Sequence, residues 1–318
     1  MRRSTRFRVV QGRRRRVNRI LIWLSASFFV LAAFLLIRYA WHAAQTGNTL
    51  TQVRRQYNAQ PEEIRTAPAS DAPLAQSTDS QAQAAAHLVS MNPQAQPRVT
   101  VAPNAAMLAE FVSLYGKNND LAGWLHSEAL PDIDFPLVQR DNAYYMSHDF
   151  YGRDNLAGNV FVDMSSSIHP RGKNIVLHGH NMKNGSMFGK LNRYLDADFT
   201  RSSPLFMFST LYETSTYVPY AVSIVSTDPA SSHFAPFVQS DFKTDQDIIA
   251  YAERLERLSL LSFPVDVQAD DRLLTLATCH GIDDRERLVL ALRELRPDEE
   301  RDALLNAIQE GLKKKIQQ

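Results

Sequence analysis

An apolar run without a single charge, residues 20–37, places the strongest constraint on this 318-residue chain. At a rise of about 1.5 Å per residue, a helix of this length comes close to the roughly 30 Å of the hydrocarbon layer of a membrane. Aromatic residues flank it as they do at membrane interfaces, namely Trp23, Tyr39 and Trp41. The sequence therefore predicts a transmembrane anchor over residues 20–41.

The net charge of +1 hides an uneven distribution. Residues 1–44 contain ten Arg and no Asp or Glu, and nine of these Arg precede the apolar run. A basic arm alone would suggest nucleic acid as a partner, but an arm that leads into an apolar run is typical of the cytoplasmic side of a membrane span. We expect a single-pass protein of the cell membrane, with residues 1–19 cytoplasmic, the rest extracellular, and no nucleic-acid partner.

Two alternatives to an anchor remain open. A cleaved signal peptide has an apolar core of roughly 7–15 residues and a cleavage site of small residues. The run here is longer, and the nearest candidate site, Ala40–Ala44, contains Trp41 and His42. A buried core helix would be unusual behind nine Arg. The sequence favours the uncleaved anchor.

Composition divides the remainder into three parts. Residues 42–102 are rich in Gln, Ala, Ser and Pro, with few large apolar residues, and predict a flexible stalk. Residues 103–296 predict the folded domain, beginning with a helix over 104–115. Residues 297–318 predict a charged helix or tail, acidic at its start and basic at its end, as the helix dipole favours.

The folded domain consists mostly of short apolar or alternating segments divided by turn residues, which predicts many strands. Their irregular spacing favours a closed β-barrel over a βαβ repeat. One helix interrupts them, and Thr244–Asp247 resembles a capping box at its start. The predicted strands are 124–127, 135–139, 159–163, 173–179, 215–226, 264–268, 272–279 and 287–295.

The single cysteine cannot form a disulfide within the chain. Composition alone favours an inert buried thiol, because free Cys is among the most buried residue types. Strand alternation argues otherwise, because Leu274 and Leu276 mark the core face while Ala277 and Cys279 lie on the other. We therefore expect Cys279 at a strand end, pointing away from the core.

The next strand carries Arg287 on the face opposite its leucines. If the two strands pair as a hairpin, Cys279 and Arg287 share a surface outside the core. A neighbouring cation favours the reactive thiolate and supplies positive charge where an oxyanion develops. The alternative is a solvated charge. Arg285, in the preceding loop, is a second candidate for the same role.

A cysteine nucleophile also requires a group that transfers protons, most often histidine. Of the nine His, only His178 and His180 lie together on the face of a strand opposite its apolar residues. His180 ends that strand before a loop rich in Gly and Asn, where catalytic groups concentrate. Position therefore favours His180.

Four segments in consistent order, between residues 107 and 295, resemble the class B sortases. Thr-Leu-Ala-Thr-Cys at 275–279, followed by an Arg-Leu-Val strand, resembles the sortase signature around the nucleophile. Residues 178–191 resemble the segment around the catalytic histidine. Residues 118–166 are similar to the class B N-terminal half, and the helix near 244–261 occupies the place of a class B helical insertion.

The resemblance implies a mainly β protein, a closed eight-stranded sortase-type barrel with an N-terminal helix and a helical insertion before the cysteine strand, preceded by one transmembrane helix. It implies Cys279 as nucleophile, His180 as general acid and base, and Arg287 as the oxyanion or substrate-orienting group. Asn142 and Met146 match positions of the substrate pocket, the second of which is usually Leu in the family.

Two further substrate-binding positions are implied next to the nucleophile, Thr278 and Ala277. Ala277 stands where the family commonly has Ser, so one polar contact is absent.

What the resemblance implies is a membrane-anchored cysteine transpeptidase that acts on secreted proteins. It would cleave their C-terminal sorting signal, an Asn-Pro-type pentapeptide, through a thioacyl intermediate, and pass them to an amine of peptidoglycan or of a pilin. We expect no cofactor and no metal. Residues 92–96 of the stalk resemble such a signal and suggest a pseudosubstrate, although composition alone explains the match.

Three other functions would require different features in the sequence. A papain-like extracellular peptidase would carry its Cys at the start of a helix near the N-terminus of the domain. An L,D-transpeptidase would carry it in a Ser-X-Gly-Cys context, which the sequence lacks. A membrane-tethered binding barrel without chemistry would not need Cys279, His180 and Arg287 in these contexts.

Overall fold

The computed structural model describes residues 4–59, 106–202, 204–280 and 285–314. The chain divides into two compact units, Met1–Asn48 and Thr49–Gln318. The long helix α1 (Ser4–Asn58) contributes to both. Within the described residues, one helix, Ile22–Asn58, is long and apolar enough to cross a membrane. The predicted stalk beyond residue 59, including residues 92–96, lies outside the described residues.

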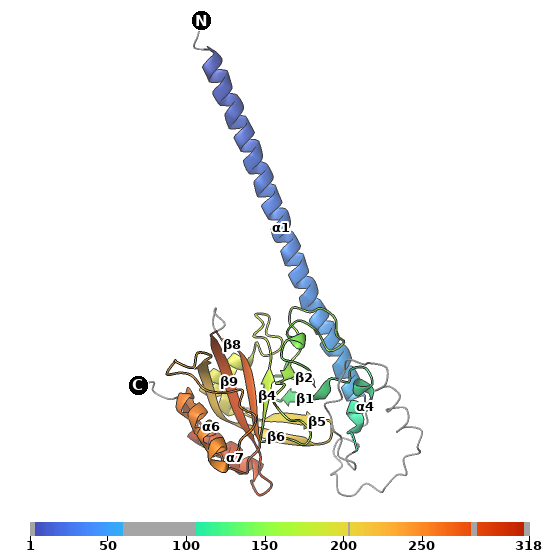
Figure 1. Cartoon of the computed structure of the whole chain (residues 1–318), viewed down its shortest axis with the longest axis vertical. Coiled ribbons are helices and arrows are strands. Elements are labelled where there is room, and N and C mark those ends of the chain that lie inside the picture. Colours follow the sequence, from blue (N-terminus) through green and yellow to red (C-terminus); the bar gives the residue numbers. More distant parts are fainter. Residues whose placement is uncertain (1–3, 60–105, 203, 281–284, 315–318) are drawn as a thin grey trace. The chain divides into compact units, whose positions relative to one another are not determined.

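A closed barrel forms the second unit (Figure 1), with its strands in the order β1-β2-β3-β4-β8-β9-β6-β5. Most neighbouring strands are antiparallel, but β2 with β3 and β4 with β8 run parallel. This confirms the predicted closed, eight-stranded barrel. Its strands are β1 (Leu121–Ser127), β2 (Asp134–Val138), β3 (Phe161–Val162), β4 (Asn174–His178), β5 (Phe206–Thr210), β6 (Thr214–Ser226), β8 (Leu273–His280) and β9 (Glu286–Glu294).

Leu274 and Leu276 of β8 and the leucines of β9 are buried in the main hydrophobic cluster, as alternation predicts. The opposite face of these strands, however, is not a surface, because Thr275 and Val289 are buried as well. Helix α6 (Asp245–Leu258) packs near this face, and the hydroxyl of Tyr251 lies 2.8 Å from that of Thr275. The expectation that the outer face is open therefore holds only at the strand ends.

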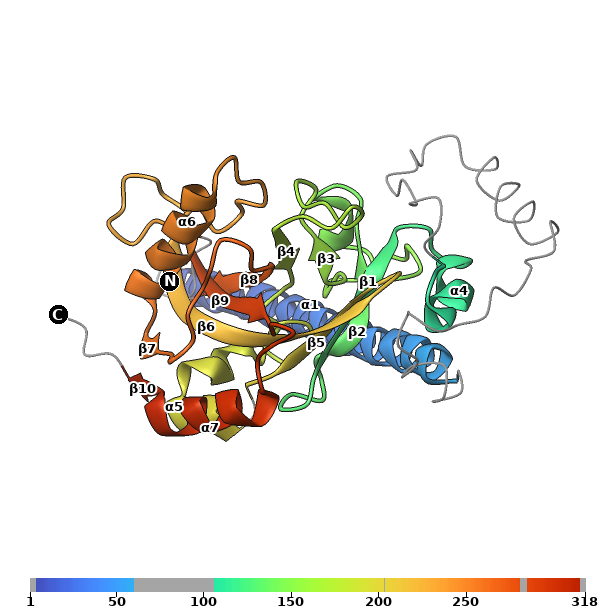
Figure 2. The ribbon, with the colours of Figure 1, turned by 90° about the horizontal axis from the view of Figure 1, so that it is seen from below.

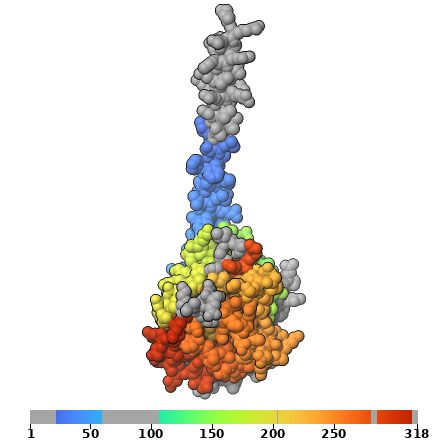
Figure 3. Space-filling model, turned by 90° about the vertical axis from the view of Figure 1, so that its left-hand side faces the viewer, coloured from blue at the N-terminus to red at the C-terminus, as the bar shows by residue number. Residues whose placement is uncertain are grey.

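Helices lie on two sides of the barrel, as Figure 2 shows with α6 on one side and α5 (Ala197–Ser202) and α7 (Arg301–Gly311) on the other. Helix α6 is the predicted insertion before β8, and its capping box forms as expected between Thr244 and Asp247. The C-terminal part of the chain, from α6 onward, forms a large part of one face of the molecule (Figure 3).

The structure differs from the expected elements in a few places. The helix α4 (Ala109–Tyr115) is shorter than the predicted one. The segment 264–268 is a loop, and the short β7 (Leu261–Ser262) precedes it. The C-terminal helix ends at Gly311, and its expected basic end instead forms β10 (Lys313–Lys314), which pairs with β7.

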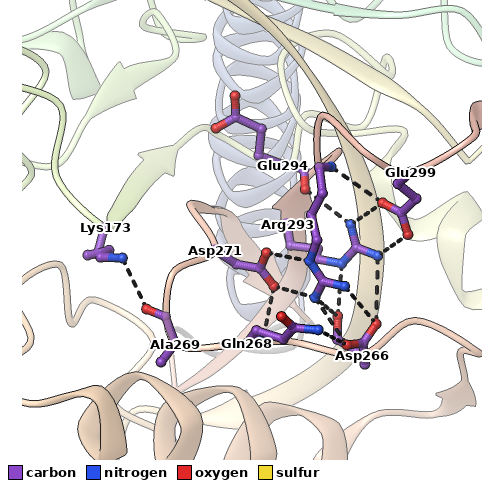
Figure 4. A network of polar contacts seen from close by, with 9 residues as sticks. Lys173, Asp266, Gln268, Ala269, Asp271, Arg293, Glu294 and Glu299 are labelled. Atoms are coloured by element: carbon purple, nitrogen blue, oxygen red, sulfur yellow. Dashed lines mark hydrogen bonds and ion pairs between the residues drawn. The ribbon is translucent and has the colours of Figure 1, made fainter.

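A buried arginine ties the end of β9 to its surroundings (Figure 4). Arg293 is completely buried and donates to both carboxylate oxygens of Glu299, at 2.7 and 2.6 Å. Its Nε donates to the carbonyl of Asp266 at 2.8 Å. The neighbouring Arg296 donates to both oxygens of Asp271 at 2.8 Å. These bonds connect β9 with the loop before β8 and with the segment that leads to α7.

The last turns of α1, which belong to the second unit, pack against the barrel. Tyr57 stacks on Trp124 of β1, with ring centroids 4.0 Å apart and nearly parallel planes. Val53 is fully buried, and Arg54 bonds the carbonyl of Asp132 at 3.0 Å. The division of the chain into anchor, stalk and catalytic domain at the residues given above stays a prediction.

Candidate active site

The strand pairing places Cys279 directly across from Arg287, because β8 and β9 are antiparallel and these two residues are register partners near the hairpin end. Cys279 is a half-buried free thiol. Arg287 is also half-buried, and its guanidinium donates to the carbonyl of Glu286 at 3.0 Å. Arg285 is exposed and precedes β9, so it is not the cross-strand partner of the cysteine.

The segment that carries His180 reaches the same end of the barrel. Strand β4 pairs in parallel with β8, and its last residue, His178, is the register partner of Ala277. Just beyond, the side-chain amide of Asn181 donates to the carbonyl of Cys279 at 2.8 Å. The extension of β4 therefore lies alongside the cysteine, although the two segments are far apart in sequence.

The imidazole of His180 is bonded to a backbone group. Its Nε2 lies 2.8 Å from the carbonyl oxygen of Met146, at the end of a short 3₁₀ helix, Tyr144–Met146. The side chain of Met146 is 42% exposed. Two of the predicted site residues, from distant parts of the sequence, are thus in direct contact through a main-chain atom.

The other histidine of this segment, His178, belongs to a separate polar cluster. Its Nε2 lies 2.9 Å from a carboxylate oxygen of the buried Asp163. The amide of Asn142 donates to the same oxygen at 2.8 Å, and its carbonyl accepts from the backbone of Met164. Burial alone would raise the pKa of Asp163, but hydrogen bonds from His178 and Ser165 outweigh it and lower the pKa to about 2.

Two predicted substrate-binding residues are buried. Thr278 and Ala277 are each 2% exposed, and the Thr278 hydroxyl has no hydrogen-bond partner among the described residues. Sequence reasoning did not single out Asp163 or Asn181. The position of Asn181 directly after the His-Gly-His segment was the available signal for it. In the part of the chain that the structure describes, no three His, Cys, Asp or Glu side chains gather into a group that could hold a metal ion.

Comparison with known proteins agrees with this geometry. Residues 130–294, more than half of the chain, match the model of the sortase domain. The chain belongs to the sortase family. It is 32% identical to Sortase B of Listeria monocytogenes over 185 residues, which cover 58% of this chain and 72% of that protein.

Two further relatives support the assignment to class B. The Sortase B of Staphylococcus aureus is 27% identical over 171 residues, which cover 54% of this sortase and 67% of that protein. The crystal structure of sortase B from Bacillus anthracis in complex with AAEK2 superposes with a TM-score of 0.55 at 26% identity, covering 70% and 99% of the two chains. This sortase is therefore of class B and a cysteine transpeptidase. The family assignment excludes the L,D-transpeptidase and the binding barrel as alternatives.

The two histidines of this sortase are expected to respond differently to truncation. We expect His180→Ala to lower kcat by about 10²–10⁴-fold, the usual contribution of a proton-transfer group. We expect His178→Ala to lose less than about tenfold in kcat. The His178→Ala substitution should also destabilise the fold by about 1–3 kcal/mol, because it leaves the Asp163 carboxylate buried without its histidine partner. Turnover should be compared at a temperature at which circular dichroism shows both variants folded. Equal losses of kcat in folded variants would contradict the assignment of His180.

Proposed function

We propose that this sortase is anchored in the cell membrane by α1, with its N-terminus cytoplasmic and its barrel outside. It cleaves an Asn-Pro-type sorting signal near the C-terminus of secreted proteins and transfers them to an amine of peptidoglycan or of a pilin. The observation that carries the proposal is the convergence of Cys279, Arg287 and the His180 segment at one end of the barrel.

The chemistry follows from the residue types. The thiolate of Cys279 attacks the carbonyl carbon of the scissile peptide bond, so a C–S bond forms and the oxygen becomes an oxyanion beside the Arg287 guanidinium. The C–N bond then breaks, and His180 gives its proton to the leaving amine. In the second half of the reaction, the nitrogen of the acceptor amine attacks the thioester, and His180 takes a proton from that amine. A new C–N bond forms and the thiolate leaves.

The loop around Asn142 supports the proposed recognition of a peptide that contains proline. Met146 and Met164 have exposed side chains, and the backbone of Met164 is bonded to the Asn142 side chain. Methionine adapts its shape to irregular apolar partners. We propose that these two side chains contact the apolar part of the sorting signal, while the amide of Asn142 is held by Asp163.

The test is a transpeptidation assay with the full chain in detergent or in vesicles. A panel of quenched peptides with Asn-Pro-type and Leu-Pro-type signals is incubated with an oligoglycine amine, a diaminopimelate-containing stem peptide, or a pilin-derived lysine peptide. We expect cleavage of an Asn-Pro-type signal and a product joined to one of these amines. Hydrolysis alone with every amine, or preference for Leu-Pro-type signals, would contradict the proposal.

The arginine assignment gives a matched pair of variants. We expect Arg287→Ala to lower kcat/KM by about 10²–10³-fold, which is the usual cost of losing a group that stabilises an oxyanion. Arg285→Ala removes the same side chain two residues away and should stay within about twofold, as expected for an exposed group outside the site. Steady-state kinetics on the best peptide of the panel measures both. A larger loss in Arg285→Ala would reverse the assignment.

A further inference from the structure

The contact between His180 and Met146 defines which ring nitrogen carries a hydrogen. A backbone carbonyl only accepts hydrogen bonds, so the His180 Nε2, 2.8 Å from the Met146 oxygen, must be protonated. In the neutral ring the free electron pair is then on Nδ1. We propose that the Met146 carbonyl holds His180 in this tautomer, so that Nδ1 performs the proton transfers, and that Thr49 of α1 holds the loop that carries this carbonyl. The inference rests on the proposed role of His180.

The carbonyl is fixed by a close approach of two backbone segments. Gly158 has a φ of +57°, in the left-handed region that favours glycine. A Cβ at this position would lie 2.3 Å from the carbonyl oxygen of Tyr145 and 2.9 Å from that of Met146. The Tyr145 oxygen also accepts from the backbone of Asn159 at 3.0 Å. The Met146 carbonyl therefore lies closely against the backbone at Gly158, which blocks its movement toward that segment.

The loop between these segments is closed by one buried carboxylate. Asp149 is 2% exposed, and its Oδ1 accepts from the backbone N–H groups of Tyr151 and Arg153, at 2.9 and 3.1 Å. The guanidinium of Arg153 donates to the other carboxylate oxygen of Asp149, Oδ2, at 2.9 Å. The backbone N–H of Asn155 donates to the carbonyl of Ser147 at 2.8 Å, directly after Met146. The Asp149 carboxylate thus sets the shape of the loop that follows Met146.

Helix α1 contributes the remaining partner of this carboxylate. The hydroxyl of Thr49, which is 3% exposed, donates to the Asp149 Oδ2 at 3.1 Å and accepts from Arg153 at 2.6 Å. Thr49 is the first residue of the second unit, so this contact lies within one compact body. The next turn of the helix buries Leu50 and Val53. The end of the helix is therefore part of the support for the Met146 carbonyl, and Thr49 is a positioning residue for His180.

The proposal assigns each proton to one atom. In the acylation step Nδ1 takes the thiol proton of Cys279, and the same nitrogen gives it to the leaving amine when the C–N bond breaks. In the transfer step the acceptor nitrogen attacks the thioester carbon, Nδ1 accepts a proton from that amine, a new C–N bond forms and the C–S bond breaks. Nδ1 then returns the proton to the Cys279 thiolate, which restores the starting thiol and neutral ring. Throughout, the Nε2–H bond to the Met146 carbonyl persists, which lets the ring become an imidazolium without rotating.

The tautomer can be measured directly on the full chain in detergent, with ¹⁵N-labelled histidine and no substrate. The His180 signals are assigned by their loss in His180→Ala. Recorded at alkaline pH, long-range ¹H–¹⁵N spectra distinguish a protonated Nε2 from a protonated Nδ1. We expect the Nε2-protonated form alone. A protonated Nδ1, or a mixture that exchanges rapidly, would overturn the proposal.

Variants at Thr49 test the support of the loop. Thr49→Val keeps the shape of the side chain but removes the hydroxyl, and we expect kcat to fall about tenfold with KM within twofold, because small misplacements of a catalytic group are costly. Thr49→Ser restores the hydroxyl and should restore kcat. Thr51→Val is the matched control, since Thr51 is exposed on the same helix. An unchanged kcat and tautomer in Thr49→Val would overturn the role of Thr49.

The two readouts separate this inference from the proposed function. If the unmodified chain fails to process any sorting peptide, the proposed function is in doubt, while the spectra still report the His180 tautomer. If peptides are processed but the tautomer is protonated at Nδ1, the proposed function stands and this inference fails. If Thr49→Val does not fold, Thr49→Ala takes its place in the kcat comparison with Thr49→Ser, and the spectra of the unmodified protein decide the His180 tautomer.

Discussion

Cys279→Ala is expected to abolish turnover of sorting peptides, by about 10³-fold or more, as removal of a nucleophile usually does. No thioacyl intermediate should then be detected by mass spectrometry after mixing with peptide. The melting temperature should stay nearly unchanged, because Cys279 is only half-buried at the end of β8 and its sulfur fills little core volume.

Cys279→Ser is the matched control, since it keeps the size of the side chain and replaces only the sulfur, the proposed nucleophile, with oxygen. It should be as inactive as Cys279→Ala and equally stable. A loss of several kcal/mol of stability in Cys279→Ala, with normal stability in Cys279→Ser, would indicate a packing role for this side chain. Residual turnover in either variant at more than about 1% would point to another nucleophile.

Arg293→Met is expected to cost about 3–5 kcal/mol of unfolding free energy, the usual effect of removing one partner of a buried ion pair. The guanidinium is fully buried, and Glu299 and the Asp266 carbonyl depend on it. Urea unfolding of the full chain in detergent measures the change. Arg301→Met is the control, because Arg301 is exposed and its ion pair with Glu128 is 3.5 Å long, so it should lose less than about 0.5 kcal/mol.

The same cluster predicts how stability depends on pH. Hydrogen bonds from Arg293 lower the pKa of Glu299 in the folded state. A lowered folded pKa contributes stability above the unfolded pKa of the carboxyl, and this contribution disappears as the pH falls through the lower, folded value. Acid should therefore destabilise the unmodified chain more steeply than Arg293→Met. Parallel acid curves for the two proteins would show that Glu299 does not contribute.

The pattern of apolar residues was sufficient to predict the barrel. It failed where contacts between distant side chains override the local preference for a strand. Residues 264–268 have the alternation of a strand, yet they form a loop. The Asp266 backbone carbonyl and carboxylate there bond to Arg293 and Arg296, instead of the backbone joining a ladder. β5 was not among the predicted strands.

The candidate site was predicted to the extent that it depends on side-chain chemistry at strand ends. The pairing of Cys279 with Arg287 follows from the short connection between two consecutive strands, which favours a hairpin. The Met146 carbonyl could not be predicted, because a backbone atom leaves no signature in the residue type. The contact between Thr49 and Asp149 joins residues 100 positions apart, and local patterns carry no information about such pairs.

The parallel pairing of β4 with β8 also determines when this site can form during folding. Parallel strands cannot be joined by a tight turn, and here Asn181 and the carbonyl of Cys279 meet although they are 98 positions apart in a chain segment that includes α6. Contacts between such distant segments carry a large loop-closure cost and form slowly. The β8–β9 hairpin is local and can form early, so we expect the thiol to meet Arg287 before it meets the histidine segment. We therefore expect a partly folded chain to be catalytically silent, because the single thiol and the proposed proton-transfer group, His180, come together only when the barrel closes.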